Sequence, residues 1–367
     1  MNVLILFTNR NFALNIMRCL ADKGIRCHLF GPSGAWEVQL SKYCCGFMAC
    51  PGKSFAECSP GLIETINQYC SRQNISCIIP AEVITTVFLS QVRERLLPQI
   101  KTVAVSEVDT LKVLDNKWEF ACLLKKHGLP QPQIFLAENM EQFEAITLPF
   151  PRVVKPLSGG GRWAAGGDIG TYVRKNMTDY LTSAQDGKAF PLIVQEFIPG
   201  VDIGLNIFAM RGRIVAWTMQ KLVKDGLLEF FHSSQLLELG DRLVSEIKFE
   251  GLANLDLRID ERDNSLKFIE CNPRCWGSLR ASMWNGVNFP LIAVNAALGQ
   301  DASKIASQNI VYVQPSRVLG RLFKGDITAL KGLPETTRKD ICQIVSDPLS
   351  CLYSIYRDML HNRIHGR

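Results

Sequence analysis

The feature that most constrains the fold is a regular alternation of short apolar strands and amphipathic helices over the first hundred residues. The segments with strand character lie at residues 3–7, 25–30, 75–80 and 102–106. The segments with a helical spacing of apolar residues lie at residues 12–24, 61–73 and 84–97. Strand–helix alternation of this kind produces a parallel sheet with helices on both faces. We therefore expect an N-terminal α/β domain.

The junction between the first strand and the first helix reads TNRNF and contains no glycine. A dinucleotide-binding domain carries G-x-G-x-x-G at this position, because the glycines let the backbone approach the pyrophosphate. The sequence therefore argues against NAD binding by this domain. A domain boundary is expected near residues 107–110, where SEVDT can cap a new helix that runs to His127.

A second informative stretch, VVKPLSGGGR at residues 153–162, joins a short β-branched strand to three consecutive glycines. Glycine lets backbone N–H groups approach phosphate oxygens closely, and Lys155 supplies a positive charge beside them. The lysine precedes the glycines, so the spacing is not that of a P-loop. The residues alone leave two interpretations open, a phosphate-binding loop and a flexible hairpin turn.

A third stretch, LIVQEFIPGVDIGLNIF at residues 192–208, begins as an apolar strand and then turns at a Pro-Gly pair. Such a strand edge can offer main-chain donors and acceptors to an adenine ring, with Phe197 and Ile198 as flat apolar cover. Asp202, just beyond the turn, can accept hydrogen bonds from ribose hydroxyls. An ordinary hairpin with a polar turn is the alternative, and this stretch taken alone favours it.

Two segments near residue 260 predict a hairpin that gathers carboxylate and amide side chains on one face. LANLDLRID places Asn254 and Asp256 on the same face, and FIECNPRCW places Glu270 and Asn272 roughly 7 Å apart on one face. A turn within ERDNS pairs Asp256 with Glu270 and Asn254 with Asn272. Facing like charges destabilise a strand pair, whereas a divalent cation such as Mg²⁺ would reverse that effect. Two solvated carboxylates are the alternative interpretation.

In their order and content, these stretches resemble the ATP-grasp superfamily over roughly residues 1–300. DNKWEF resembles the first ATP-binding lysine segment, VVKPLSGGGR the second lysine and phosphate loop, VQEFIPG the adenine hinge, and LDLRID with FIECNPR the metal hairpin. The closing IECNPRCWGSLRASMWNGVNFP is close to the E-x-N-P-R-x-W-G-S segment of the carboxylate–amine ligase branch. The resemblance is to a carbamoyl-phosphate-synthase-like ATP-grasp protein.

The resemblance implies a role for each matching residue. The implied ATP-binding residues are Lys117, Lys155, Ser158, Gly159, Gly160, Gly161, Gln195, Glu196, Phe197, Ile198 and Asp202. The implied ligands of Mg²⁺, with Mn²⁺ as the alternative ion, are Asp256, Glu270 and Asn272. The implied catalytic residues are Lys155 and Arg274, with Arg274 facing the reacting carboxylate. Asp202 stands where the family often has glutamate, so the ribose contact is the weakest of these assignments.

The resemblance also implies a domain plan of mixed α/β and α+β class. The expected parts are a Rossmann-like pre-ATP-grasp domain (1–108), a small ATP-grasp subdomain with the phosphate lid (109–192), a large subdomain with the hinge and metal hairpin (193–300) and a C-terminal extension (301–367). The implied reaction is ligation of a carboxylate to an amine through an acyl phosphate, with release of ADP and phosphate. Carboxylation or phosphorylation by the same fold, and non-catalytic ATP binding, are the alternatives.

The composition limits the kinds of binding partner that we expect for this chain. The formal charge of +6 comes without a long basic run, which fits an anionic small molecule better than nucleic acid. No apolar run reaches about 18 residues, so we expect no membrane span. The 13 cysteines lack a C-x-x-C pair and suggest reduced, buried thiols, such as Cys19, Cys77 and Cys122, in a cytoplasmic protein. A homodimer is compatible with this composition.

The acceptor side of the site is weakly specified by the sequence. The candidates there are Glu82, Gln220, Lys221 and His232. Beyond residue 300, LSCLYSIYRDML at residues 349–360 predicts a helix with one apolar stripe that packs on its own domain. A membrane-surface or partner-binding role of the stripe is the alternative.

Overall fold

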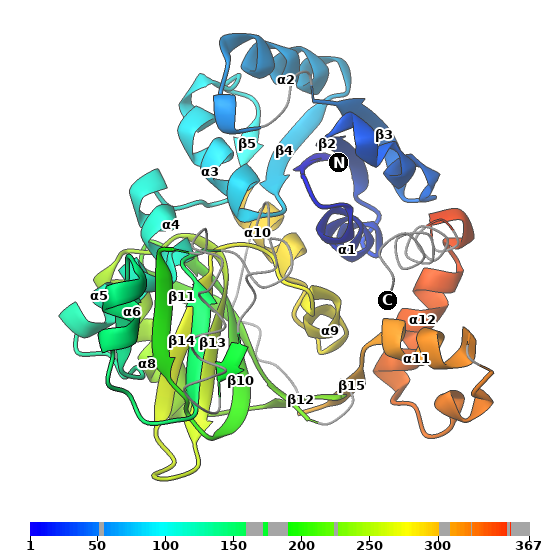
Figure 1. Ribbon diagram of the computed structural model, residues 1–367. Coiled ribbons are helices and arrows are strands. Elements are labelled where there is room, and N and C mark those ends of the chain that lie inside the picture. Colours follow the sequence, from blue (N-terminus) through cyan, green and yellow to red (C-terminus); the bar gives the residue numbers. More distant parts are fainter. Residues whose placement is uncertain are drawn as a thin grey trace.

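The computed structural model contains three β-sheets surrounded by helices (Figure 1). It describes residues 1–50, 55–158, 172–174, 190–223, 227–300, 309–323, 325–350 and 353. Among these residues, none of the helices combines the length and apolarity needed to span a bilayer.

The first sheet is the predicted parallel sheet of the N-terminal domain. Its strands are β1 (Asn2–Leu6), β2 (Arg26–Gly31), β3 (Cys44–Ala49), β4 (Ile75–Pro80) and β5 (Lys101–Thr102). All four pairings are parallel, in the order β3-β2-β1-β4-β5. β3 was not predicted, because its short sequence CCGFMA is only partly buried, and β5 is shorter than the predicted strand.

Helices pack on this sheet from both ends of the sequence. The local helices are α1 (Arg10–Ala21), α2 (Pro60–Arg72) and α3 (Val83–Val92). A later helix, α10 (Phe289–Ala297), contacts α1, β4 and β5. The N-terminal strands therefore share one hydrophobic core with residues such as Phe208, Trp276 and Phe289. This shared core fixes the N-terminal domain relative to the rest of the chain.

Where a single helix up to His127 was predicted, the chain forms α4 (Val108–Asp115) and α5 (Lys117–Lys126). The break occurs at Asn116, whose backbone is extended and whose side chain accepts hydrogen bonds from the N–H groups of Trp118 and Glu119. Asn116 therefore caps α5 and places Lys117 in its first turn.

The second sheet is a small antiparallel one. Its strands are β6 (Ile134–Ala137), β7 (Arg152–Pro156), β8 (Tyr172–Arg174) and β9 (Leu192–Glu196), in the order β6-β9-β7-β8. The helix α6 (Met140–Ala145) places Phe143 in the core of this subdomain. Gly159, Gly160 and Gly161, predicted for the phosphate lid, lie outside the described residues.

The third sheet has six strands in the order β14-β13-β10-β11-β12-β15. The strands are β10 (Gly200–Met210), β11 (Arg213–Leu222), β12 (Leu227–Phe231), β13 (Gly251–Asp260), β14 (Leu266–Asn272) and β15 (Val311–Val313). Helix α8 (Ser234–Glu246) packs on β10 and β11. Gly200 begins β10 with φ near +127° and lies so close to the Ile259 carbonyl that no Cβ would fit.

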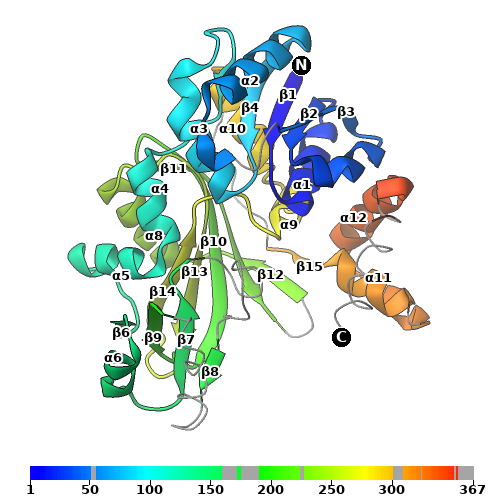
Figure 2. The same ribbon diagram turned by 45° about the horizontal axis from the view of Figure 1, so that its top comes forward.

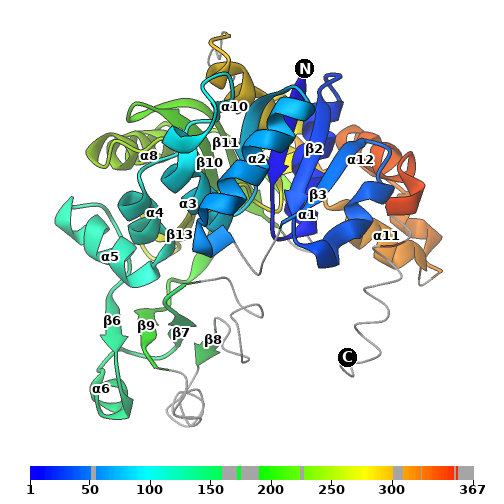
Figure 3. The ribbon, with the colours of Figure 1, turned by 90° about the horizontal axis from the view of Figure 1, so that it is seen from above.

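After α9 (Leu279–Trp284) and α10, the chain returns to the edge of the third sheet as β15. It continues as α11 (Pro315–Phe323), the 3₁₀ turn η5 (Ile327–Leu330) and α12 (Glu335–Val345). Figures 2 and 3 show α12 beside the N-terminal domain. Of the helix predicted at residues 349–360, the structure describes only residues 349, 350 and 353.

The described cysteines are all free thiols. Cys19 and Cys77 are buried as predicted, but Cys122 is exposed, so its predicted burial is wrong. Cys122 lies on α5, where Phe120, Ala121 and Leu124 take the buried face of the helix. Burial raises the pKa of Cys77 to about 12, which makes that thiol unreactive.

Candidate active site

The predicted register of the β13–β14 hairpin is confirmed. Asp256 pairs with Glu270 and Asn254 pairs with Asn272. The register shifts between Asp256 and Leu257, which pairs with Phe268 and leaves one extra residue on β14. Leu257 and Phe268 are both buried in the hydrophobic core. The bulge therefore keeps the apolar pair inside while the two carboxylates face each other.

The two facing carboxylates differ in their pKa values. Burial, reinforced by the charge of Glu270, raises the pKa of Asp256 to about 7. Burial would also raise the pKa of Glu270, but the ammonium groups of Lys117 and Lys155 hold it below its usual value. At neutral pH, Glu270 is therefore charged, and Asp256 is the member of the pair that holds a proton more readily. A bound divalent cation would keep both groups ionised.

Asn272 completes this group from the end of β14. Its amide nitrogen lies 3.2 Å from a carboxylate oxygen of Asp256, 3.3 Å from one of Glu270 and 3.3 Å from the amide oxygen of Asn254. Three oxygens thus converge on one positively polarised group. Mg²⁺ prefers oxygen ligands, so the carboxylates of Asp256 and Glu270 suit the ion as they stand. Asn272 would have to turn its amide oxygen, which accepts from Arg274, toward the ion.

Two lysines from different elements meet this hairpin. Nζ of Lys117, in the first turn of α5, lies 3.2 Å from a Glu270 carboxylate oxygen. Nζ of Lys155, on β7, donates to the Ile269 carbonyl at 3.5 Å. Lys155 is only 2% exposed, and this burial lowers its pKa to about 8. The backbone N–H of Lys117 donates to the Leu157 carbonyl at 2.7 Å, which joins α5 to the end of β7.

Arg274 follows β14 and connects the hairpin to the N-terminal domain. Its guanidinium donates to the amide oxygen of Asn272 at 2.9 Å and to the Cys275 carbonyl at 2.7 Å. The same group lies over the ring of Phe12, 4.9 Å from the ring centre. Arg274 is therefore held beside the three oxygen-bearing side chains.

The residues predicted for the adenine hinge lie at the end of β9. Gln195 is buried and paired with β6 and β7, and Ile198 is buried beyond the strand. The backbone N–H of Glu196 donates to the Gln133 carbonyl at 2.8 Å, so that donor already has a partner. Phe197 is partly buried, with its ring beneath the guanidinium of Arg258.

Asp202 and Ser158 lie at the margins of this arrangement. Asp202 pairs across the sheet with Arg258, and their side chains form an ion pair. Its carboxylate therefore has a protein partner in this structure, although it also lines the cavity described next. Ser158, predicted to begin the phosphate lid, is exposed directly after β7.

A cavity of about 450 Å³ lies over the carboxylates. Its lining includes Asp202, Gly204, Gln220, Asp256, Glu270, Gly277, Ser278 and Gln314. Gln220, one of the acceptor candidates, donates to the Ser278 hydroxyl at 2.9 Å. Lys221 and His232 are not among the lining residues, and Lys221 forms an ion pair with Glu229. Ser278 and Gln314 were missed, although Ser278 belongs to the E-x-N-P-R-x-W-G-S segment.

Glu82 has a different position from the other acceptor candidates. Its buried carboxylate accepts hydrogen bonds from the backbone N–H groups of Thr8 and Asn9, at the end of β1. Burial raises the pKa of Glu82 to about 7. A dinucleotide-binding domain presents its pyrophosphate-binding amides at this junction. Here a carboxylate takes those donors, which supports the prediction against NAD binding.

Together, a parallel N-terminal domain and two antiparallel sheets that meet at a lysine- and carboxylate-bearing hairpin define the ATP-grasp class of fold. Residues 188–317 match the family model described as "ATP-grasp in the biosynthetic pathway with Ter operon". The chain has the ATP-grasp fold, and residues 188–317 are similar to that family. Within that class it is similar to carbamoyl phosphate synthase large chains and to D-alanine–D-alanine ligases.

Two curated relatives illustrate this similarity. The chain is 25% identical over 228 residues to the carbamoyl phosphate synthase large chain of Pyrococcus furiosus, covering 56% of this chain and 20% of that protein. It is 26% identical over 234 residues to the D-alanine–D-alanine ligase of Anaplasma marginale, covering 56% of this chain and 66% of that protein. The matches thus span about a fifth of the first relative's length and 66% of the second's.

Solved structures show the same fold. An L-amino acid ligase from Bacillus licheniformis superposes with a TM-score of 0.62 at 17% identity, covering 81% of this chain and 74% of that one. An N5-carboxyaminoimidazole synthetase from Staphylococcus aureus, complexed with ADP, gives a TM-score of 0.67 at 14% identity, covering 91% and 90%.

Proposed function

We propose that the protein is an ATP-dependent ligase that joins a small-molecule carboxylate to an amine in the cytoplasm. The observation that carries the proposal is the meeting of Lys117 and Lys155 with the Asp256–Glu270 pair beneath a cavity. Two cations and two carboxylates from separate elements are costly to bury together unless they serve a charged ligand. A nucleotide triphosphate with its metal ion is such a ligand.

In the proposed reaction, a carboxylate oxygen of the substrate bonds to the γ-phosphorus of ATP, and the bond from that phosphorus to ADP breaks. The amine nitrogen then attacks the acyl carbon of the resulting acyl phosphate. The carbon–oxygen bond to phosphate breaks, and the amine proton leaves with phosphate or solvent. The products are an amide, ADP and phosphate.

Lys117 and Lys155 would balance the negative charge of the ATP phosphates. Asp256, Glu270 and Asn272 would hold Mg²⁺, or Mn²⁺ in its place. Bound there, the ion would supply further neutralisation of the phosphoryl charge. Arg274 would stabilise the oxyanion of the tetrahedral intermediate through its planar set of donors.

Residues of the hinge and the lid would make the remaining contacts with ATP. Main-chain and apolar groups of Gln195, Glu196, Phe197 and Ile198 would hold adenine, and Asp202 would accept the ribose hydroxyls after exchanging its Arg258 partner. The lid of Ser158, Gly159, Gly160 and Gly161 would cover the phosphates. Two similar proteins are an L-amino acid ligase and a D-alanine–D-alanine ligase, so amino acids are the first substrates to test.

The test is a screen of the purified protein with ATP and Mg²⁺ against pairs of amino acids and against bicarbonate. Phosphate and ADP release are measured, and products are identified by mass spectrometry. We expect an amide, ADP and phosphate in equal amounts. A carboxylated product formed from bicarbonate would show that the reaction is carboxylation and not ligation. A stable phosphorylated acid would show that it is phosphorylation.

Lys155→Ala provides the catalytic control in this screen. The variant should lose at least about 100-fold in kcat/KM, because a positive charge at the transferring phosphate is removed. Circular dichroism should show an intact fold. Full activity of Lys155→Ala would exclude the proposed phosphate contact.

A further inference from the structure

A second cavity, of about 520 Å³, adjoins the first one and is not used by the reaction steps above. Gly277, Ser278 and Gln314 line both cavities. The other residues that line the second cavity come from three places: α1 with its N-cap Asn9, the helix α9, and residues 309–323 and 325–350, called here the C-terminal arm. A ligand in the second cavity would therefore reach the reacting centre past Ser278 and Gln314.

The C-terminal arm is anchored to α9 through Asp340, on α12. The carboxylate of Asp340 forms an ion pair with Arg280 and accepts hydrogen bonds from the Trp284 indole, at 2.7 Å, and from the Tyr312 hydroxyl. Asp340 is 1% exposed. A buried charge with three donors fixes the position of α12 relative to α9.

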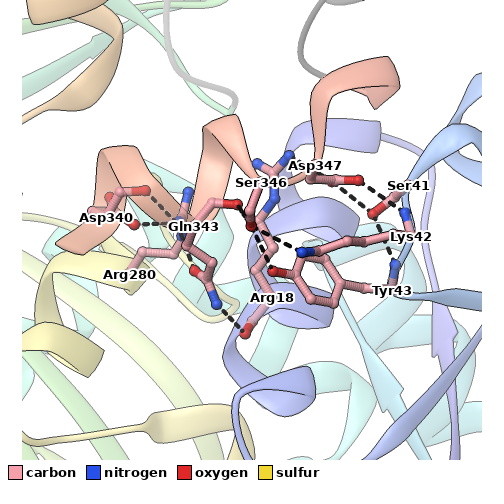
Figure 4. Close-up of polar contacts among 9 residues, drawn as sticks. All are labelled: Arg18, Ser41, Lys42, Tyr43, Arg280, Asp340, Gln343, Ser346 and Asp347. Atoms are coloured by element: carbon pink, nitrogen blue, oxygen red, sulfur yellow. Dashed lines mark hydrogen bonds and ion pairs between the residues drawn. The ribbon is translucent and has the colours of Figure 1, made fainter. Parts of the chain in front are cut away.

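A second buried carboxylate, Asp347, anchors the arm to the N-terminal domain (Figure 4). It lies 3.1 Å from Nη2 of Arg18 and accepts hydrogen bonds from the Ser41 hydroxyl at 2.7 Å and the Lys42 N–H at 2.8 Å. Between the two anchors, Gln343 donates to the Arg18 carbonyl at 3.2 Å and accepts from Arg280 at 2.7 Å.

These anchors determine the chemical character of the cavity. Arg18 and Arg280 both line it, but each is already paired with an aspartate of the arm. Their charges are therefore balanced within the protein and are not available to a phosphate or another dianion. Beside apolar groups such as Phe12 and Ile344, the wall offers uncharged polar groups. These are the amides and hydroxyls of Asn9, Asn11, Asn15, Ser278, Gln314 and Ser316. Such a lining suits an uncharged polar molecule or a zwitterion.

We propose that the second cavity binds the amine substrate, a small polar or zwitterionic molecule such as an amino acid, and that the C-terminal arm determines which amine fits. The inference rests on the proposed ligase function. It adds that the amine enters between α1 and the C-terminal arm.

The test compares two neighbouring substitutions on α12. Ile344 lines the cavity, whereas Val345 is 56% exposed and does not line it. Ile344→Trp adds bulk to the cavity and should raise the KM for the amine by about tenfold or more, with the KM for ATP unchanged. Val345→Trp should behave like the parent protein. Asn15→Leu, which replaces a polar group on the opposite wall with an apolar one branched at the same carbon, should also raise the KM for the amine. It replaces Ile344→Trp if that variant does not fold.

The anchoring role is tested without any substrate. Asp347→Asn keeps the size of the side chain but removes the charge that pairs with Arg18. Amide hydrogen exchange should become faster in the C-terminal arm and in α1, while the β13–β14 hairpin should keep its protection. Glu335→Gln, which removes an exposed ion pair with Lys339 on the same helix, is the matched control and should leave exchange unchanged.

The outcomes separate the two proposals. Equal amine KM values for the Ile344→Trp, Asn15→Leu and Val345→Trp variants of a working ligase would overturn the assignment of this cavity and leave the ligase function standing. Turnover by the parent with phosphorylated amines alone would overturn the proposed substrate class. A parent protein that forms no amide with any pair would instead reject the ligase function itself.

Discussion

Asp256 and Glu270 face each other across two strands, yet their surroundings give them opposite charge behaviour. Glu270 lies beside two ammonium groups, whereas the nearest strong influences on Asp256 are burial and the Glu270 charge. In the metal-free protein, the charge of Glu270 is therefore stabilising, whereas a charge on Asp256 is not.

This difference predicts opposite effects of two conservative substitutions on the metal-free protein. Glu270→Gln leaves Lys117 and Lys155 with less compensation, so the free energy of unfolding should fall by about 1–3 kcal/mol. Asp256→Asn removes repulsion from Glu270 and should leave stability unchanged or slightly higher. Urea denaturation measures both. Both variants should also lose most turnover with Mg²⁺, and normal rates for either at limiting Mg²⁺ would contradict the metal site.

The raised pKa of Asp256 also predicts how stability depends on pH. The folded protein keeps a proton on Asp256 up to a pKa of about 7, whereas the unfolded chain releases it near the ordinary value of 3.8. The folded state binds more protons between these values, so the contribution of Asp256 to the free energy of unfolding decreases as pH rises through this range. Denaturation of the metal-free protein should show this slope, and Asp256→Asn should reduce it.

Metal binding should have the opposite pH dependence. The ion competes with the proton on Asp256, so Mg²⁺·ADP affinity should rise with pH up to about 7 and level off above it. Isothermal titration calorimetry in two buffers of different ionisation enthalpy would detect the released proton. An affinity that is flat across this range would show that Asp256 is not a ligand.

At the scale of elements, the break between α4 and α5 determines where Lys117 lies. Asn116 satisfies two N–H groups of the first turn of α5, which starts with this buried lysine. Asn116→Ala should cost about 1 kcal/mol of stability and weaken nucleotide binding, because the first turn would fray. Asn116→Asp, which preserves the cap, is the control. Thermal melts with and without Mg²⁺·ADP compare the two, and equal losses for both variants would contradict a capping role.

The sequence predicts the elements better than it predicts their breaks and long-range contacts. Alternation of apolar and polar residues was enough to place β13 and β14, and the Asp256–Glu270 register was predicted correctly even though the bulge beside Ile269 was not. The break at Asn116 was missed, because an asparagine within an amphipathic pattern can also occupy a helix interior. The Asp347–Arg18 contact has no local pattern at all, because it forms only when the folded domains bring the two residues together.

At the scale of the whole molecule, we expect the N-terminal domain to have a structural role and not to bind a dinucleotide. The carboxylate of Glu82 already accepts the N–H groups of Thr8 and Asn9 where a pyrophosphate would bind. We therefore expect NADH to have no effect on stability. Mg²⁺·ATP at 100 times its Kd should raise the free energy of unfolding by about 2.7 kcal/mol. Differential scanning fluorimetry is the measurement. Stabilisation by NADH without stabilisation by ATP would reverse the assignment.

The pairing of Arg18 with Asp347 affects the order in which the parts of the protein can fold while the chain is being synthesised. The two residues are 329 positions apart in the sequence. At typical rates of translation, Arg18 is made about 15–65 s before its partner. During that interval the first domain can fold, but the guanidinium on α1 stays in water and the second cavity has no outer wall. Nucleotide affinity should therefore appear in the nascent chain before amine affinity does.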